Sequence, residues 1–275
     1  MSDIMDNGVK SMDPETIKSC CSTFYENDLV AMFFGENFHP GGEKLTLHMG
    51  EKLGLDETSK VLDVACGAGA SSLALADRYG CHVIGIDLSE KNLEKAKKKA
   101  QDTNLSDKLE FVKSDAEKLK FEDETFDAII CECALCTFPD QKTAASEMYR
   151  VLKKGGRLGI TDVIIEKELP EALSNLASQV ICIAGALPAD EYKALFREAN
   201  FKDVQYENQN ECIREIIGRA DKLLFGWDLI KKRYDFDLKG ILGITQEEAK
   251  DLIKTGYEEL EKGTFGYGLF TGIKE

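Results

Sequence analysis

An alternation of short apolar runs and helical segments, beginning near residue 60, is the feature that most constrains the fold of this chain. Stretches with a helical pattern, such as SLALADRYG and EKNLEKAKKKA, separate runs that have the length and composition of buried strands. Five such runs are KVLDVAC (60–66), HVIGIDLS (82–89), LEFVKSDA (109–116), FDAIICEC (126–133) and GRLGITDVI (156–164). Parallel strands need crossover connections, which are usually helices. The alternation therefore predicts an α/β fold whose parallel sheet is covered by helices on both faces.

We expect one domain over residues 1–275, built around a core in residues 56–206. Ahead of the core, Ile17, Cys20, Cys21 and Phe24 recur with helical spacing, so residues 1–55 are expected to form a helical lid. Within the core, the helix TAASEMYRVLKK (143–154) is expected to end at the glycine pair that follows it.

The chain behind the core follows another pattern. Two helical segments predict an insertion in residues 207–262, and Thr245 with Glu248 forms a capping box for the second of them. The run TFGYGLFTGIK is rich in aromatic and β-branched residues, which predicts a final strand in residues 263–275.

Composition and charge limit the functions open to the chain. A formal net charge of −15 argues against nucleic acid and anionic membranes as partners, since their phosphates would be repelled. No apolar run approaches the ~20 residues of a membrane span, and the N-terminus MSDIMDNGVK is too polar for a signal peptide. An odd number of cysteines, nine, without a secretory signal indicates free thiols and a cytoplasmic location.

A glycine-containing loop, DVACGAGASS (63–72), lies between an expected strand and helix, where an open parallel sheet binds its ligand. Asp87 ends the next strand, as expected for an acid that binds ribose hydroxyls. Ser72 stands where the dinucleotide fingerprint has its third glycine, and the Asp63 carboxylate would repel a pyrophosphate. S-adenosylmethionine carries a sulfonium and an ammonium and no phosphate, so the charges favour it over NAD.

Four segments together resemble the successive motifs of the class I S-adenosylmethionine-dependent methyltransferases. They are VLDVACGAGA, VIGIDLS, SDAEKLKFEDETFDAII and RVLKKGGRLGITDV, and the resemblance covers about residues 55–205. It implies a Rossmann-like sheet of seven strands whose last strand inserts antiparallel, in agreement with the terminal run FGYGLFTGIK.

The resemblance also implies a cofactor site. By position, the residues are Asp63, Gly67 and Gly69 at the methionine end, Asp87 and Leu88 at the ribose, and Asp115 and Ala116 at the adenine. Two alternatives stay open: Asp63 as a turn-stabilising acid, and Asp115 as an acid that caps its own loop.

Three cysteines fall in CECALCTF (131–138), at the end of the fourth expected strand. Residues i and i+2 of a strand face the same way, so Cys131 and Cys133 are expected to point together into the cleft, beside the methyl group of the cofactor. ECALCTFPDQK is similar to a segment of the arsenite methyltransferases, and CIAGALPADEYKALFREANFKDV (182–204) resembles another. This similarity implies that Cys133 and Cys182 are the two arsenic-binding thiols, with Cys136 as a candidate third.

The chain departs from that family at both ends. The N-terminal segment that carries a thiol in the family is FFGENFH here, and the cysteine-rich C-terminus is replaced by the helical pair. The thiols also have two other interpretations: small apolar packing residues, or a zinc site, although structural zinc needs four ligands in two anchored pairs. We expect no resident metal.

The predicted function is methyl transfer from S-adenosylmethionine to a soft, thiol-bound acceptor such as arsenite or a related metalloid or thiol. A lone pair on such an acceptor needs no strong base. An oxygen or nitrogen acceptor needs proton removal, for which His39 in FHPGG and Glu132 are the candidates. The alternatives are O-, N- or C-methylation of a small organic metabolite, and a non-catalytic thiol-based metalloid sensor. The expected partner is thus a small molecule or metalloid, and the sequence does not indicate an oligomeric state.

Overall fold

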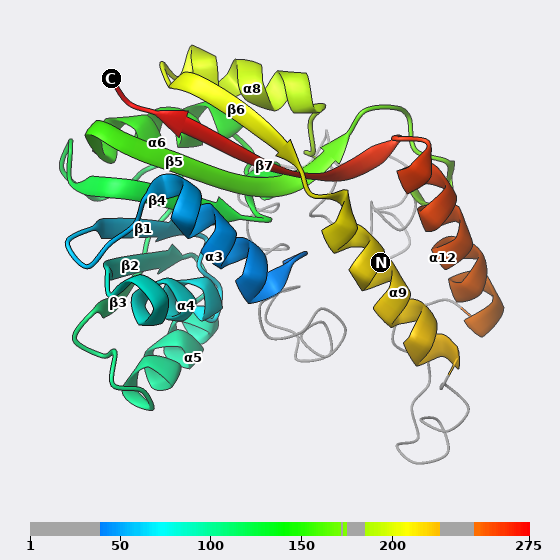
Figure 1. Ribbon diagram of the computed structural model, residues 1–275, viewed down its shortest axis with the longest axis horizontal. Coiled ribbons are helices and arrows are strands. Elements are labelled where there is room, and N and C mark those ends of the chain that lie inside the picture. Colours follow the sequence, from blue (N-terminus) through cyan, green and yellow to red (C-terminus); the bar gives the residue numbers. More distant parts are fainter. Residues whose placement is uncertain (1–38, 172, 175–184, 226–244) are drawn as a thin grey trace.

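A seven-stranded sheet with the order β3-β2-β1-β4-β5-β7-β6 forms the centre of the protein (Figure 1). The structure, a computed structural model, describes residues 39–171, 173–174, 185–225 and 245–275. The first five strands pair in parallel, and β7 runs antiparallel between β5 and β6, so the predicted topology is confirmed. The strands are β1 (Lys60–Val64), β2 (His82–Asp87), β3 (Leu109–Lys113), β4 (Phe126–Glu132), β5 (Leu152–Ile165), β6 (Lys202–Asn208) and β7 (Phe265–Ile273).

Helices cover both faces of the sheet, as the sequence predicts (Figure 1). One face packs against α3 (Gly42–Leu53), α4 (Ala70–Tyr79) and α5 (Glu90–Gln101). The other packs against α6 (Gln141–Val151) and α8 (Ala189–Glu198), which bury the largest apolar cluster together with β4 and β5. The short helix η3 (Leu135–Thr137) follows β4.

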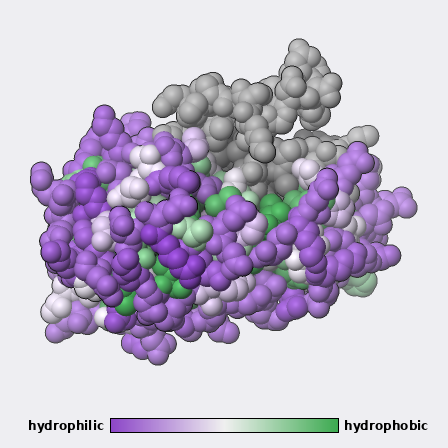
Figure 2. Space-filling model, turned by 90° about the horizontal axis from the view of Figure 1, so that it is seen from above, coloured by the Kyte–Doolittle hydropathy of each residue, from purple (hydrophilic) through white to green (hydrophobic). Residues whose placement is uncertain are grey.

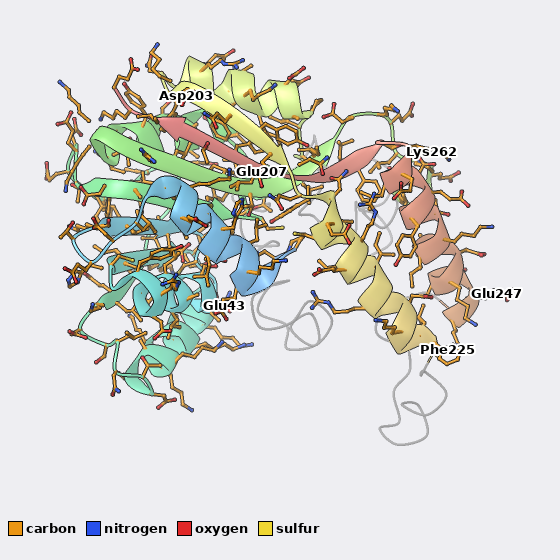
Figure 3. All side chains as sticks on the ribbon, viewed as in Figure 1. Glu43, Asp203, Glu207, Phe225, Glu247 and Lys262 are labelled. Carbon is orange, nitrogen blue, oxygen red and sulfur yellow. The ribbon has the colours of Figure 1, made fainter. Side chains whose placement is uncertain are left out.

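A helical pair, α9 (Asn210–Phe225) and α12 (Gln246–Glu261), lies between β6 and β7 in the chain, where the sequence predicts an insertion. The two helices pack against each other, and Phe225 at the end of α9 is exposed (Figure 3). The predicted capping box is confirmed, because Thr245 accepts from the Glu248 N–H while Glu248 accepts from the Thr245 N–H. Most of the expected lid, including Cys20 and Cys21, lies outside the described residues.

One predicted boundary is wrong. The helix expected over residues 143–154 ends at Val151, and Leu152 already belongs to β5, where it pairs with Phe126. The glycine pair therefore lies inside the strand segment, and Gly155 donates its N–H to the Lys274 carbonyl at 2.6 Å. Sheet pairing overrides the helix-ending signal of the glycines at this point.

Helix α3, which borders the site, is held by contacts to β6 on one side and to α4 on the other. Glu207 of β6 accepts from Lys52 at 2.6 Å and lies 2.9 Å from His48 Nε2 (Figure 3). On the other side, the Tyr79 hydroxyl of α4 donates to the Leu47 carbonyl at 2.6 Å.

The described surface is mostly hydrophilic in the view of Figure 2, with a few apolar patches. Among the described residues, no helix combines the length and the apolar character that crossing a bilayer requires.

Candidate functional site

The loop between β1 and α4 needs glycine at two positions for different reasons. Gly67 and Gly69 have φ values of 52° and 77°, which side chains other than glycine rarely adopt. A Cβ on Gly69 would lie 2.9 Å from the Ala96 Cβ and from the Phe111 ring, so this glycine permits close packing. A Cβ on Gly67 would meet no described atom within 4 Å, so a ligand can approach the backbone there.

Asp87 holds this loop from the end of β2. One carboxylate oxygen accepts from the Gly67 N–H at 2.9 Å and the other from the Ser89 N–H at 2.8 Å. Each carboxylate oxygen has two lone pairs, so Asp87 can bind the loop and still accept from a ribose hydroxyl. Leu88 follows it and is partly buried.

Asp63 is 2% exposed and accepts from the Ser72 hydroxyl at 2.6 Å. The pKa of Asp63 is raised to about 8, first by burial and then by the nearby carboxylates of Glu132 and Asp87, while the Ser72 hydrogen bond acts in the opposite direction. This contact ties β1 to α4, which is the turn-stabilising alternative. Its partner, Ser72, was noted in the sequence only because it stands where the dinucleotide fingerprint has its third glycine.

The connection after β3 carries the residues expected at the adenine. Asp115 accepts from the Glu117 N–H at 2.9 Å, a contact that caps the loop, and Ala116 is buried. The Ser114 hydroxyl is buried and has no hydrogen-bond partner within the described part of the chain. Such an atom is costly to leave without a partner, so a ligand group that bonds to it would relieve this cost.

His39 and Glu132 meet at the carboxyl edge of the sheet. His39 Nε2 lies 3.6 Å from Glu132 Oε2, and both side chains are only 4% exposed. Thr46 of α3 donates to Glu132 Oε2 at 2.9 Å, and its hydroxyl lies 3.4 Å from His39 Nε2. Ser71, at the start of α4, lies 3.5 Å from the same nitrogen. The pair is therefore next to the glycine loop.

One ring nitrogen of His39 faces a backbone acceptor. Its Nδ1 lies 3.2 Å from the Pro40 carbonyl oxygen, which can only accept. A proton on Nδ1 would donate to this oxygen, and Nε2 would then present a lone pair toward Thr46 and Glu132. A proton taken up at Nε2 would lie beside the Glu132 carboxyl group, 3.6 Å away.

Thr46 and Ser71 are absent from the residues predicted for the site. Thr46 gives a signal, since it is a polar residue on the buried stripe of α3, between Leu45 and Met49. Its partner Glu132 is far away in the sequence, so the pattern alone does not identify the contact.

The expected common direction of Cys131 and Cys133 is wrong. Cys131 is buried in the apolar cluster under α6 and α8, and burial raises the pKa of its thiol well above the ordinary value. Cys133 lies beyond the end of β4 with φ at 53°, donates its N–H to the Thr161 carbonyl at 2.7 Å and packs on the α3 side. The alternation of a strand does not continue through a left-handed residue, which reverses the direction of the side chain.

The remaining predicted thiols separate as well. Cys136 is buried in η3, and its N–H donates to Asp162 at 2.8 Å. Cys182 lies outside the described residues. Across the described ranges, no group of three or more His, Cys, Asp or Glu side chains is arranged to hold a metal ion.

Asp162 is a buried acid that is absent from the residues predicted for the site. It lies in β5 and also accepts from its neighbour, the Val163 N–H, at 2.8 Å. Burial raises its pKa to about 6, while hydrogen bonds from Cys136 and Val163 act in the opposite direction. Asp162 thus anchors the loop that follows Glu132 and Cys133.

The site fits S-adenosylmethionine. The backbone at Gly67 faces open space, and Asp87 can accept a hydrogen bond from a ribose hydroxyl. The Ser114 hydroxyl, beside the residues expected at the adenine, can bond to a ligand group. The acids of Glu132 and Asp87, both close to Asp63, suit a cofactor with positively charged groups.

Comparisons with known proteins agree with this fit. Residues 55–200 match the family described as methyltransferase domain. An uncharacterized protein of Haemophilus influenzae is 36% identical over 181 residues, which cover 65% of this chain and 72% of that protein. Methyltransferase GfsG of Streptomyces halstedii is 29% identical over 205 residues, covering 68% and 74%.

A solved structure also shares the fold. Phosphoethanolamine N-methyltransferase 2 of Haemonchus contortus, in complex with S-adenosyl-L-methionine, superposes with a TM-score of 0.79 at 20% identity. The match covers 94% of this chain and only 60% of that one.

Proposed function

Because the chain belongs to the methyltransferase domain family and is an S-adenosylmethionine-dependent methyltransferase, we propose that it methylates a small organic molecule at an atom that must lose a proton. The acceptor is an alcohol, a phenol, an amine or a carbon acid. His39 takes up the proton, and Glu132 stabilises the imidazolium that results.

The observation that carries this proposal is the buried contact between His39 and Glu132. Neither side chain is more than 4% exposed, so the charge that develops on the imidazole is compensated by the carboxylate 3.6 Å away rather than by water. A histidine with this environment, next to the glycine loop of a methyltransferase, suits a general base.

Each neighbour of the pair has a separate task. Thr46 holds the Glu132 carboxylate by its hydroxyl hydrogen bond, and the Pro40 carbonyl keeps the Nδ1 proton of His39 in place. Bound S-adenosylmethionine supplies an electrophilic methyl group. The chain orients the acceptor, excludes water and receives the displaced proton at His39 Nε2.

The soft-acceptor prediction is the second candidate. Its support is Cys133, a partly exposed thiol next to Glu132 and on the α3 side where His39 lies. Cys131 and Cys136 are buried by packing, and Cys182 lies outside the described residues, so the described thiols do not form a set of arsenic ligands. The structural neighbour named above, a phosphoethanolamine N-methyltransferase, carries the name of an enzyme with an organic acceptor. A cytoplasmic location remains a prediction, and membership in the family argues against a sensor without catalysis.

Incubating the protein with methyl-labelled S-adenosylmethionine and two acceptor sets tests the proposal. One set contains alcohols, phenols, amines and carbon acids; the other contains arsenite, selenite and free thiols. We expect label in the first set, with loss of transfer in His39→Gln and no change in His82→Gln, since His82 is an exposed histidine remote from the site. Label confined to the second set, at equal rates in both variants, would overturn the proposal in favour of the thiol-based candidate.

A further inference from the structure

The connection between β3 and β4 has little regular structure of its own. An isolated bridge between Asp115 and Lys118 is the only strand pairing in this described stretch. Its first residues are those expected at the adenine. Their position therefore depends on what holds the remainder of the connection, residues 117–125.

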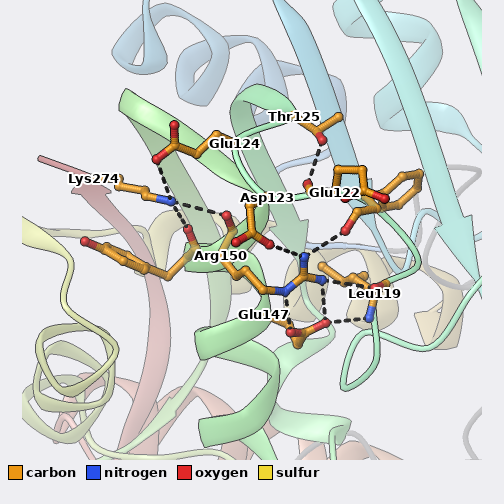
Figure 4. A network of polar contacts seen from close by, with 10 residues as sticks. Leu119, Glu122, Asp123, Glu124, Thr125, Glu147, Arg150 and Lys274 are labelled. Atoms are coloured by element: carbon orange, nitrogen blue, oxygen red, sulfur yellow. Dashed lines mark hydrogen bonds and ion pairs between the residues drawn. The ribbon is translucent and has the colours of Figure 1, made fainter.

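Arg150, in the last turn of α6, binds three residues of this connection (Figure 4). Its Nη1 donates to the Phe121 carbonyl and to Asp123, both at 2.8 Å. Its Nη2 donates to the Leu119 carbonyl at 3.1 Å. Two backbone carbonyls and one side chain of the connection are thus bound by one guanidinium.

Glu147, one turn earlier on α6, orients that guanidinium. It accepts from Arg150 Nε at 2.8 Å and from Nη2 at 2.9 Å, and it also accepts from the Leu119 N–H at 2.8 Å. A guanidinium has five N–H donors, and these contacts use all five. Hydrogen bonding from Arg150 lowers the pKa of Glu147, so the pair stays charged.

The other end of the connection is fixed to the start of α6. Glu117 accepts from the Asp140 N–H at 2.8 Å, and Asp140 is the N-cap of the helix. The connection is therefore bound to α6 at two places, one near the start of the helix and one near its end. Lysine in place of arginine would keep the charge but not the planar fork that reaches both carbonyls.

We propose that Arg150 is a positioning residue for the adenine side of the cofactor site, acting through Leu119 and Phe121 on the connection that begins with Asp115 and Ala116. This proposal rests on the cofactor site in the proposed function and not on His39. Loss of the fork releases the carbonyls of the connection, so donor binding weakens while the methyl-transfer step, at the far end of the cofactor, is preserved.

Calorimetric titration of S-adenosylhomocysteine into four variants tests this, with unfolding curves to correct for folded protein. We expect Arg150→Gln to raise Kd about tenfold and Arg150→Lys to raise it by less, because the Leu119 and Phe121 carbonyls lose charged hydrogen-bond donors that hold the connection. Asp123→Asn removes one exposed contact and should change Kd less than twofold. Arg214→Gln is the matched control, since Arg214 pairs with Glu211 and Glu261 on the helical pair.

Steady-state kinetics separate positioning from stability. A positioning role raises KM for S-adenosylmethionine in Arg150→Gln and Arg150→Lys and leaves kcat per folded molecule within about twofold. Wild-type Kd in both Arg150 variants, or a loss of kcat with unchanged KM, would overturn the proposal. Because the titration contains no acceptor, failure of the His39 mechanism would leave these affinities as expected.

Discussion

The buried carboxyl of Asp63 should make stability fall as the pH rises. In the folded protein its pKa is raised from 3.8 to about 8, mainly by burial, so the folded state binds this proton more tightly than the unfolded chain does. Between these two values the unfolded chain has released the proton and the folded protein has kept it. The free energy of unfolding therefore decreases by ~1.4 kcal/mol per pH unit from this group. Over the whole window the loss is on the order of 5 kcal/mol.

Asp63→Asn removes this titration and keeps an oxygen that can accept from Ser72. We expect its free energy of unfolding to exceed that of the wild type by an amount that grows as the pH rises from 5 to 8, by ~1.4 kcal/mol per unit. Urea unfolding at four pH values across this range, without cofactor, measures the difference. Asp77→Asn, at an exposed position on α4, is the control. Parallel pH profiles of wild type and Asp63→Asn would show that Asp63 is ionised in the fold and would refute the reasoning.

Two further predictions concern the cofactor and the thiols. Asp87→Ala should weaken S-adenosylhomocysteine binding by more than tenfold in calorimetry, because it removes the ribose acceptor and frees the Gly67 N–H, each charged hydrogen bond being worth ~1.5–3 kcal/mol; an unchanged Kd would remove Asp87 from the site. Cys133→Ser should leave methylation of an organic acceptor within about twofold of wild type, since a hydroxyl in partly apolar surroundings costs mainly stability. Near-complete loss of labelled-methyl transfer in Cys133→Ser, with donor affinity intact, would instead support the thiol-bound acceptor.

Local sequence patterns correctly predicted the features that depend on residues close together in the chain. The Thr245–Glu248 box is local, and so is the apolar face of α5, where Leu93, Ala96 and Ala100 are buried as expected. The seven strands and the antiparallel β7 were implied by the resemblance to a family, because a short stretch of sequence does not show which distant strands pair.

The site features that the sequence did not indicate depend on tertiary contacts. Thr46 meets Glu132 only because α3 packs beside the carboxyl edge of the sheet, and Asp162 contacts Cys136 only because β5 pairs with β4. The direction of Cys133 follows from one left-handed backbone angle, which an ordinary cysteine in an apolar run does not indicate.

The pH dependence of kcat/KM tests the role of His39 most directly. With an acceptor identified by labelled-methyl transfer, wild type and His82→Gln should show a rising limb that reports a base. His39→Gln should lose that limb and fall by about 10²–10⁴-fold, the usual contribution of a general base, while its Kd for S-adenosylhomocysteine stays within about threefold. Thr46→Val should show a smaller loss, because it removes only the hydroxyl that holds the Glu132 side chain in place. If His39→Gln instead retains the wild-type rate and the same limb, His39 takes up no proton and the account of the site is contradicted.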